Sequence, residues 1–268
     1  MGHEFIVFLF TFGLFLGMLL FLEIGRRITI RRRKQDAGVS GEGVGAVDGA
    51  VFALLGLLIA FTFSGASSRF DARRQLIVEE TNDIGTAYLR LDLLPADLQP
   101  ALRESFRRYL DTRIEVYQKL PDMAAAKESL AKANELQSQI WRQAVAATRA
   151  QGAPPAAPIL LLPALNAMID ITTTRTMATQ MHPPTVVFVM LFGLALAASL
   201  LAGFGMTGNK VRCWLHMLGF ALAMAVAVYV ILDIEYPRLG LIRVDAFDQA
   251  LIDLRESMNR DIQTERQK

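Results

Sequence analysis

The sequence predicts an all-α membrane protein with four transmembrane helices and a helical extramembrane bundle between spans two and three. Four stretches lack Asp, Glu, Lys and Arg altogether: residues 5–22, 49–66, 185–207 and 213–232. Each is close to the roughly 20 apolar residues that cross a bilayer as a helix. The polar segment 69–182 that separates the second stretch from the third spaces its apolar residues as helices do, without the alternation of a strand.

The chain therefore divides into four segments. A first transmembrane hairpin, with spans at about 5–24 and 47–67, is followed by the extramembrane bundle, a second hairpin and an amphipathic helical tail. Their ranges are 1–68, 69–182, 183–234 and 235–268. We interpret the first apolar stretch as a retained helix rather than a signal peptide. Its leader Met1-Gly2-His3-Glu4 has no Lys or Arg, and no small-residue cleavage site follows before Arg26.

The second span is expected to continue into the bundle as one long helix, because apolar residues recur beyond it at coiled-coil spacing. These residues are Phe70, Ile77, Ile84, Tyr88 and Leu91. Pro95 should end that helix. Asp97 is the predicted cap of the next one, which stops near Pro121, and a third helix ends at Gly152-Ala153-Pro154-Pro155.

A fourth bundle helix, about 159–181, leads through His182-Pro183-Pro184 into the third span, and an antiparallel arrangement is the simplest for four such helices. In the tail, an apolar face predicts an amphipathic helix over about 245–265, lying on the bundle or on the membrane interface. This face consists of Phe247, Leu251, Leu254 and Met258.

Charge indicates an orientation and excludes one class of partner. Short loops rich in Lys and Arg stay in the cytoplasm. Both short loops are basic, with Arg26, Arg27, Arg31, Arg32, Arg33 and Lys34 in one and Lys210 and Arg212 in the other. We therefore expect a bacterial inner-membrane protein with 69–182 and both termini on the periplasmic side. A net charge of only +2 gives no indication of a nucleic-acid partner.

The second span has two distinct faces. One is a stripe of small residues that would let helices approach closely, either within one subunit or between subunits. It consists of Gly49, Ala53, Gly56, Ala60 and Ser64. The other face consists of Phe52, Leu55, Ile59 and Phe63, which meets lipid or a neighbouring helix, or forms the apolar constriction of a pore in a ring of subunits.

Asp48 begins this span, where a carboxylate either stabilises the helix amino terminus or forms an acidic ring at the pore mouth. At its other end, Arg69, Arg73 and Arg74 would form a basic collar or pair with acids such as Asp71.

Polar residues near the outer ends of spans two and three form a possible ion-binding vestibule. Oxygen ligands there would suit a hard cation. We favour the alternative, a salt-bridge network of Glu79, Glu80 and Arg175, because charges on helix surfaces are usually paired or solvated. The vestibule residues are Glu79, Glu80, Asn82, Asp83, Asn166 and Asp170. Beyond the fourth span, Asp233 and Glu235 oppose the helix dipole and need partners, for which Arg238 and Arg243 are candidates.

Enzymatic chemistry has little support. His3, His182 and His216 are far apart, and neither a metal triad nor a nucleophile set is visible, so we expect no catalytic residue, metal or cofactor. The glycine-rich run from Gly38 to Gly49 lacks the Lys and Ser/Thr of a phosphate-binding loop.

Two motifs resemble one family. They are FTFSGASSRFDARRQLIVEETNDIGTAYLRLDLLP at 61–95 and LLPALNAMIDITTTR at 161–175. With the two closing spans, they are similar to the bacterial bestrophin-like domain family over roughly 45–232. The resemblance implies distant kinship with bestrophins, homo-oligomeric ion channels whose second membrane helix lines the pore with an aromatic and apolar neck. Bestrophins keep the region between spans two and three in the cytoplasm, opposite to the side that the arginines predict here.

These observations predict a homo-oligomeric ion channel, a tetramer or pentamer, whose pore is lined by the second span. Its partners would be the lipid bilayer, further copies of itself and inorganic ions. The alternative is a membrane-anchored sensor or scaffold whose extramembrane bundle binds a ligand or a partner protein.

Overall fold

All regular secondary structure in the described part of the chain is helical, which confirms the predicted fold class. The computed structural model describes residues 3–35, 44–120, 122–205 and 214–266, with side chains for 4–32, 45–120, 122–205 and 214–260. The α-helices are α1 (His3–Gln35), α2 (Val44–Leu89), α3 (Gln99–Gln118), α4 (Met123–Thr148), α5 (Ala156–Gln180), α6 (Thr185–Gly205), α7 (Trp214–Glu235) and α8 (Gln249–Arg266). Short 3₁₀ turns are η1 (Arg90–Leu93) and η3 (Asp245–Asp248).

The chain forms two compact units. Unit 1 comprises residues 1–70 and 182–242, and unit 2 comprises 71–181 and 243–268. Among the described residues, four helical segments are long and apolar enough to cross a bilayer, and their apolar parts lie in α1, the first part of α2, α6 and α7. The protein is therefore a multi-pass membrane protein, as predicted.

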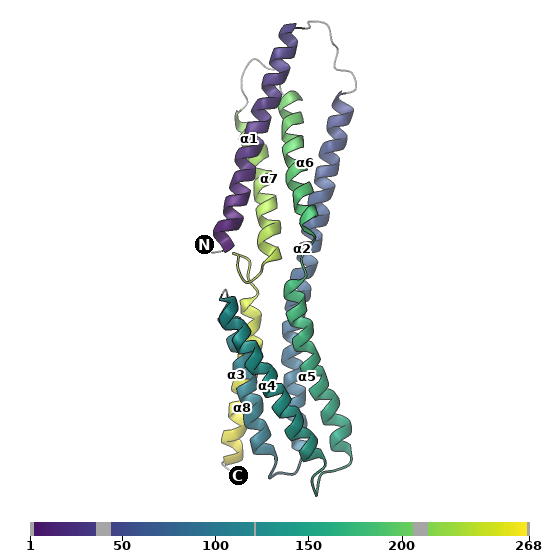
Figure 1. Cartoon of the computed structure of the whole chain (residues 1–268), viewed down its shortest axis with the longest axis vertical. Helices are drawn as coiled ribbons and strands as arrows, with labels where there is room; N and C mark the ends of the chain where they lie inside the picture. Colours follow the sequence, from purple (N-terminus) through teal and green to yellow (C-terminus); the bar gives the residue numbers. More distant parts are fainter. Residues whose placement is uncertain (1–2, 36–43, 121, 206–213, 267–268) are drawn as a thin grey trace. The chain divides into compact units, whose positions relative to one another are not determined.

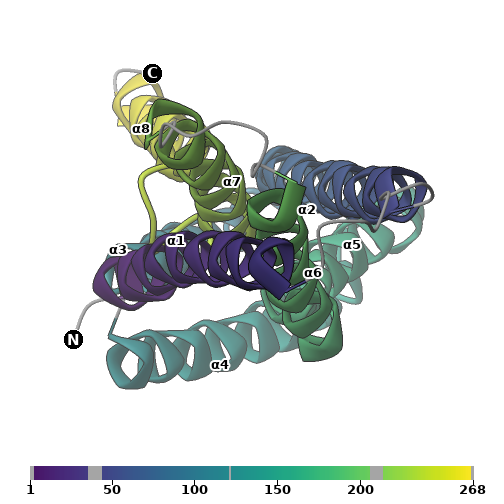
Figure 2. The same ribbon diagram turned by 90° about the horizontal axis from the view of Figure 1, so that it is seen from above.

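In unit 1, α1 packs along α6 and α7, and α6 lies between α1 and α2 in both views (Figures 1 and 2). Glycines let α1 and α6 approach to backbone contact. A Cβ on Gly25 would overlap the carbonyl oxygen of Leu200, and a Cβ on Gly203 would lie 2.7 Å from the carbonyl carbon of Leu22. The Thr29 hydroxyl donates a hydrogen bond of 3.1 Å to the carbonyl oxygen of Phe204 and thereby closes the crossing.

In unit 2, α3, α4 and α5 run in alternating directions beside the second part of α2 (Figure 1). Their buried core is built from the helical stripes seen in the sequence, including Ile84, Phe106, Ile140 and Leu165. The long helix predicted from span two is present, although its α-helical part ends at Leu89 and one 3₁₀ turn follows before Pro95.

Helix caps agree with the sequence only in part. Asp97 is not a cap, because α3 begins after Leu98 with no side-chain hydrogen bond, and the proline in its first turn has no N–H to satisfy. Asp122 caps α4 instead, accepting hydrogen bonds from the N–H groups of Ala124 and Ala125 at 3.0 and 3.1 Å.

The tail helix α8 lies on the bundle, which is one of its two predicted positions. Leu251 and Met258 are fully buried in the core of unit 2. Arg255 reaches Asp111 of α3 with an Nε–Oδ1 distance of 2.7 Å. The tail is therefore part of the extramembrane bundle and not a helix lying on the membrane interface.

Candidate functional site in the second spanning helix and its extramembrane continuation

The membrane segment of α2 is the least covered of the four spans. Only 6% of its most apolar window is buried within the chain, against 28% for Glu4–Arg32, 28% for Ala156–Gly205 and 33% for Trp214–Glu235. A helix this apolar must cover its surface with lipid or with another polypeptide. The second span therefore has most of its surface available for contacts outside its own chain.

The small-residue stripe lies on this uncovered surface. Its five members are all exposed: Gly49, Ala53, Gly56, Ala60 and Ser64. A Cβ added to Gly49 or Gly56 would meet no atom within 4 Å. Packing within the chain, which was one of the two interpretations of the stripe, therefore does not involve these residues.

The neighbouring face, which carries Phe52, Leu55, Ile59 and Phe63, is divided between the interior and the surface of the chain. Leu55 is only 2% exposed, and Phe52 and Ile59 pack against the same core. The Phe52 ring lies edge-on to Phe220 of α7, with 6.2 Å between ring centroids. Phe63, one turn beyond Ile59, is 45% exposed. Among the predicted neck residues, Phe63 is therefore the most exposed on the surface of the chain.

Asp48 is half-buried in the first turns of α2. Its Oδ1 atom is shielded from solvent and has no hydrogen-bond donor among the described residues. A carboxylate in the first turns of a helix is stabilised by the positive end of the helix dipole.

The arginine collar is engaged in contacts within each unit. In unit 1, Arg69 binds Glu235 with an Nη2–Oε2 distance of 2.7 Å, and His182 approaches the other carboxylate oxygen at 3.1 Å. Glu235 is completely buried. Arg69 and His182 thus reach Glu235 from segments that are distant in the sequence.

The neighbouring acid, Asp233, also has partners. It accepts hydrogen bonds from the backbone N–H groups of Leu241 at 2.9 Å and Ile242 at 2.7 Å. The acids at the end of α7 are thereby satisfied by a guanidinium, an imidazole and the returning chain.

In unit 2, Arg73 contacts a helix end, and Arg74 contacts an acid of its own helix and an aromatic ring. Arg73 donates to the carbonyl oxygens of Ala178 and Met181 at 3.1 and 2.9 Å, at the end of α5. A cation is favoured there because the last carbonyls of a helix lack N–H partners. Arg74 pairs with Asp71 at 3.0 Å, and its guanidinium lies 4.2 Å from the ring centroid of Phe247.

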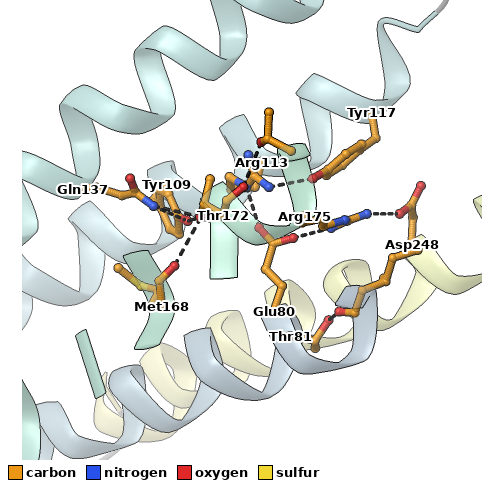
Figure 3. Close-up of polar contacts among 12 residues, drawn as sticks. Glu80, Thr81, Tyr109, Arg113, Tyr117, Gln137, Met168, Thr172, Arg175 and Asp248 are labelled. Atoms are coloured by element: carbon orange, nitrogen blue, oxygen red, sulfur yellow. Dashed lines mark hydrogen bonds and ion pairs between the residues drawn. The ribbon is translucent and has the colours of Figure 1, made fainter. Parts of the chain in front are cut away.

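A buried charge cluster joins four elements of unit 2 (Figure 3). Glu80 of α2 is completely buried and binds two arginines, Arg113 of α3 with an Nε–Oε1 distance of 2.6 Å and Arg175 of α5 through its other oxygen. Arg175 also reaches Asp248 of η3 at 3.0 Å. Two carboxylates thus face two guanidiniums, and the formal charges balance.

Tyr117 completes the cluster on the side of α3. Its hydroxyl accepts a hydrogen bond of 2.6 Å from Arg113, and the Arg175 guanidinium lies 3.7 Å from its ring centroid. Burial by itself would raise the pKa of Glu80, but the attraction of the two arginines and their hydrogen bonds outweigh it and lower the pKa. Glu80 is therefore ionised at neutral pH.

A neutral hydrogen-bond triad lies beside the cluster. The Tyr109 hydroxyl and the Thr172 hydroxyl are 3.1 Å apart, and the Gln137 amide donates to both at 3.0 and 2.9 Å (Figure 3). Burial raises the pKa of Tyr109 to about 12. This triad links α3, α4 and α5 and remains uncharged.

Comparison with known proteins identifies the family. The family model for the bestrophin-like domain matches residues 12–246 of this chain. The chain belongs to the bestrophin-like domain family. A comparison with curated proteins gave no significant match.

Solved structures with a similar fold include variants of a bacterial bestrophin homologue from Klebsiella pneumoniae. Two of these variants share 14% identity with this chain, which they match over 91% and 93% of its length and 98% of their own, with TM-scores of 0.65 and 0.68. Another structure, described as a membrane protein, shares 15% identity over 91% of this chain and 98% of its own, with a TM-score of 0.61. At this identity, the likeness concerns the fold.

In this bestrophin-like chain, the predicted vestibule residues have different environments. Glu79, Asn82, Asn166 and Asp170 are exposed, whereas Glu80 belongs to the buried cluster. Asp83 is half-buried, and burial, together with the nearby Glu79 and Glu80, raises its pKa. Among the described residues, no group of three or more His, Cys, Asp or Glu is placed to hold a metal ion. Cation coordination by the exposed oxygens stays a prediction.

Sequence reasoning found part of the buried cluster. Glu80 and Arg175 were expected to pair, but Arg113 and Asp248 were not singled out. A signal for Arg113 exists, because it follows Phe106 and Tyr109 on the apolar stripe of α3, where an arginine must have a buried partner. Asp248 gives no such signal, since it lies in a short turn before the tail helix.

Proposed function

We propose that this protein is a homo-oligomeric ion channel in which the uncovered face of α2 surrounds the pore. The main observation behind this proposal is that only 6% of the most apolar part of α2 is buried within the chain, far less than in the other spans. Membership of the bestrophin-like family supports the proposal, because bestrophins, to which the sequence is distantly related, use their second span in this way.

The exposed face gives the proposed pore its chemistry. Phe63 supplies a ring at a narrow point, and the small residues let neighbouring copies of α2 approach closely. Asp48 would place one carboxylate per copy at one mouth. Because Leu55 is buried in the subunit and Phe52 contacts Phe220, we assign the constriction to Phe63 and the residues beside it.

Conductance of the purified protein in planar bilayers tests this proposal. Reconstituted wild type should show ion-selective currents, and Phe63→Ala should change the unit conductance several-fold because it widens an apolar constriction. Phe10→Ala is the matched control. Phe10 is 60% exposed on α1, and its substitution should leave the conductance unchanged because the proposed pore is lined by α2. Asp48→Asn should alter the cation-to-anion permeability ratio.

Two results would count against the channel. If a stable oligomer gave no current in bilayers, the sensor or scaffold would be favoured. If Phe63→Ala and Phe10→Ala changed the conductance equally, α2 would not line the pore. The exposed surface of unit 2 is the part of the protein that a partner of such a scaffold would meet.

We further propose that the basic loops lie on the cytoplasmic side of a bacterial inner membrane, which puts unit 2 in the periplasm. Labelling of Met123→Cys with a membrane-impermeant thiol reagent, in a Cys213→Ser background, checks this orientation, because Met123 is 58% exposed in unit 2. Labelling of intact spheroplasts is expected. Labelling only after permeabilisation would reverse the orientation.

A further inference from the structure

A second surface of unit 1 has the chemistry of a lipid-binding site. On α1, five exposed residues follow one another at steps of three and four and so share one face of the helix. They are Leu16, Leu20, Ile24, Arg27 and Arg31, and we refer to them as the α1 stripe. The apolar members are 49%, 58% and 38% exposed, in chain order, and the two arginines follow directly.

The arginines of this stripe are accessible. The Arg27 side chain is 68% exposed, and its Nε atom lies 2.8 Å from Glu23. Glu23 also binds Arg26 at 3.1 Å, so that one carboxylate serves two guanidiniums. Arg31 is exposed and has no ion pair among the described residues. The end of α1 therefore carries an excess of positive charge.

Aromatic residues mark the same end of unit 1 as the level of the lipid headgroups. The Arg32 guanidinium lies 5.8 Å from the ring centroid of Phe204, near the end of α6. Trp214, which begins α7, is 50% exposed. Exposed tryptophans beside arginines are typical of the membrane–water interface.

We propose that the α1 stripe binds an anionic phospholipid. The phosphate of its headgroup contacts Arg27 and Arg31, and one acyl chain lies along Ile24, Leu20 and Leu16. Guanidinium groups bind phosphate oxygens through charge-assisted hydrogen bonds. A free phosphate ion would use only the arginines, whereas the continuous apolar extension of the stripe fits a lipid.

Lipid binding to the full-length purified protein tests the site directly. Affinities for phosphatidylglycerol and for phosphatidylcholine with the same acyl chains are measured by native mass spectrometry after delipidation. A juxtamembrane arginine contributes roughly fivefold to binding of an anionic surface. Arg27→Gln with Arg31→Gln should therefore weaken phosphatidylglycerol binding about 25-fold, with little change for phosphatidylcholine.

The controls separate this site from general charge. Arg108→Gln with Arg142→Gln removes the same charge from exposed positions of unit 2 and should leave both affinities unchanged. Arg27→Lys with Arg31→Lys should keep most of the binding. The single variant Arg31→Gln leaves the Glu23 contacts intact and should lose about fivefold, which excludes misfolding as the cause.

Three outcomes would overturn the proposal: wild-type affinity for phosphatidylglycerol in the double glutamine variant, an equal loss in the unit 2 control, or displacement of the lipid by millimolar inorganic phosphate. None of these measurements depends on ion conduction.

Discussion

At the scale of single residues, the feature with the largest consequence for stability is a buried carboxylate that binds two guanidinium groups. Glu80, Arg113 and Arg175 are nearly or fully inaccessible to solvent. Burying charges is costly, and their attraction offsets that cost only when every partner is present. The cluster therefore fixes which faces of α2, α3 and α5 meet, because a rotated helix would leave a buried charge without its counter-ion.

Glu80→Gln should destabilise unit 2 by about 3–5 kcal/mol, since it leaves two buried guanidiniums facing a neutral amide. Thermal and denaturant unfolding of the purified protein in detergent measure the effect. Glu79→Gln, which changes the same chemistry at an exposed neighbour, is the control and should stay within about 0.5 kcal/mol of wild type. Equal stability of the two variants would contradict the structural role of the cluster.

The same carboxylate predicts a dependence of stability on pH. Because the folded-state pKa of Glu80 is lowered, its contribution is present above the pKa of an unfolded glutamate, about 4.3, and is lost as pH falls toward the folded value. Unfolding midpoints should thus drop below about pH 4.3 more steeply in wild type than in Glu80→Gln. Parallel curves for the two proteins would refute this assignment.

Side-chain pairing was predictable only where both partners lay on helix faces already singled out. The pairing of Glu80 with Arg175 was expected, because both flank the spans that bring α2 and α5 together. The pairing of Glu235 with Arg69 joins residues 166 positions apart, and no local spacing reveals it. Long-range ion pairs depend on the tertiary arrangement, which periodicity does not determine.

At the scale of elements, the contact of α1 with α6 depends on the absence of two side chains. Gly25 and Gly203 each face the backbone of the other helix. In membranes, where apolar side chains gain little by leaving lipid, such close backbone approach is a main source of helix association. The sequence shows these glycines but not their partners, since a glycine inside an apolar stretch is equally compatible with lipid contact.

Gly25→Ala should weaken this crossing by about 1–3 kcal/mol, because its Cβ would overlap the Leu200 carbonyl oxygen and lie 2.9 Å from the Phe204 nitrogen. Thermal stability in detergent reports the loss. Gly13→Ala is the matched control on the same helix, since its Cβ meets no atom within 4 Å and alanine is the better helix former. A wild-type melting temperature for Gly25→Ala would show that the two helices can separate freely.

Helix extents were predictable to within a few residues, whereas helix ends were less so. The apolar period defines α3, α4, α5 and α8, because burial of one face decides where a helix must persist. The cap assigned to Asp97 was wrong, because Pro100 already relieves the first turn of an unsatisfied N–H group. Local hydrogen bonding offers several solutions of similar free energy, and periodicity does not choose among them.

At the scale of the whole molecule, α2 is the one among the four described spans that the fold of the chain leaves largely uncovered. The other three spans bury 28–33% of their most apolar windows, but α2 buries 6%. Composition alone could not show this, because all four spans are similarly apolar. A long helix that displays glycine, alanine and serine along its free side is suited to contact with identical helices more than with lipid.

Cysteine cross-linking tests whether copies of α2 meet. In a Cys213→Ser background, Ala60→Cys should form disulfide-linked dimers in native membranes upon mild oxidation. The reason is that the small-residue stripe of one α2 would contact the α2 helix of the next subunit. Phe10→Cys, at an exposed position of α1, should remain monomeric. Since disulfides need Cα atoms within about 7 Å, a dimer at residue 60 without one at residue 10 requires close approach of α2 specifically. Cross-linking at both positions would indicate random collision, and cross-linking at neither would leave α2 surrounded by lipid and remove the basis for a pore along it.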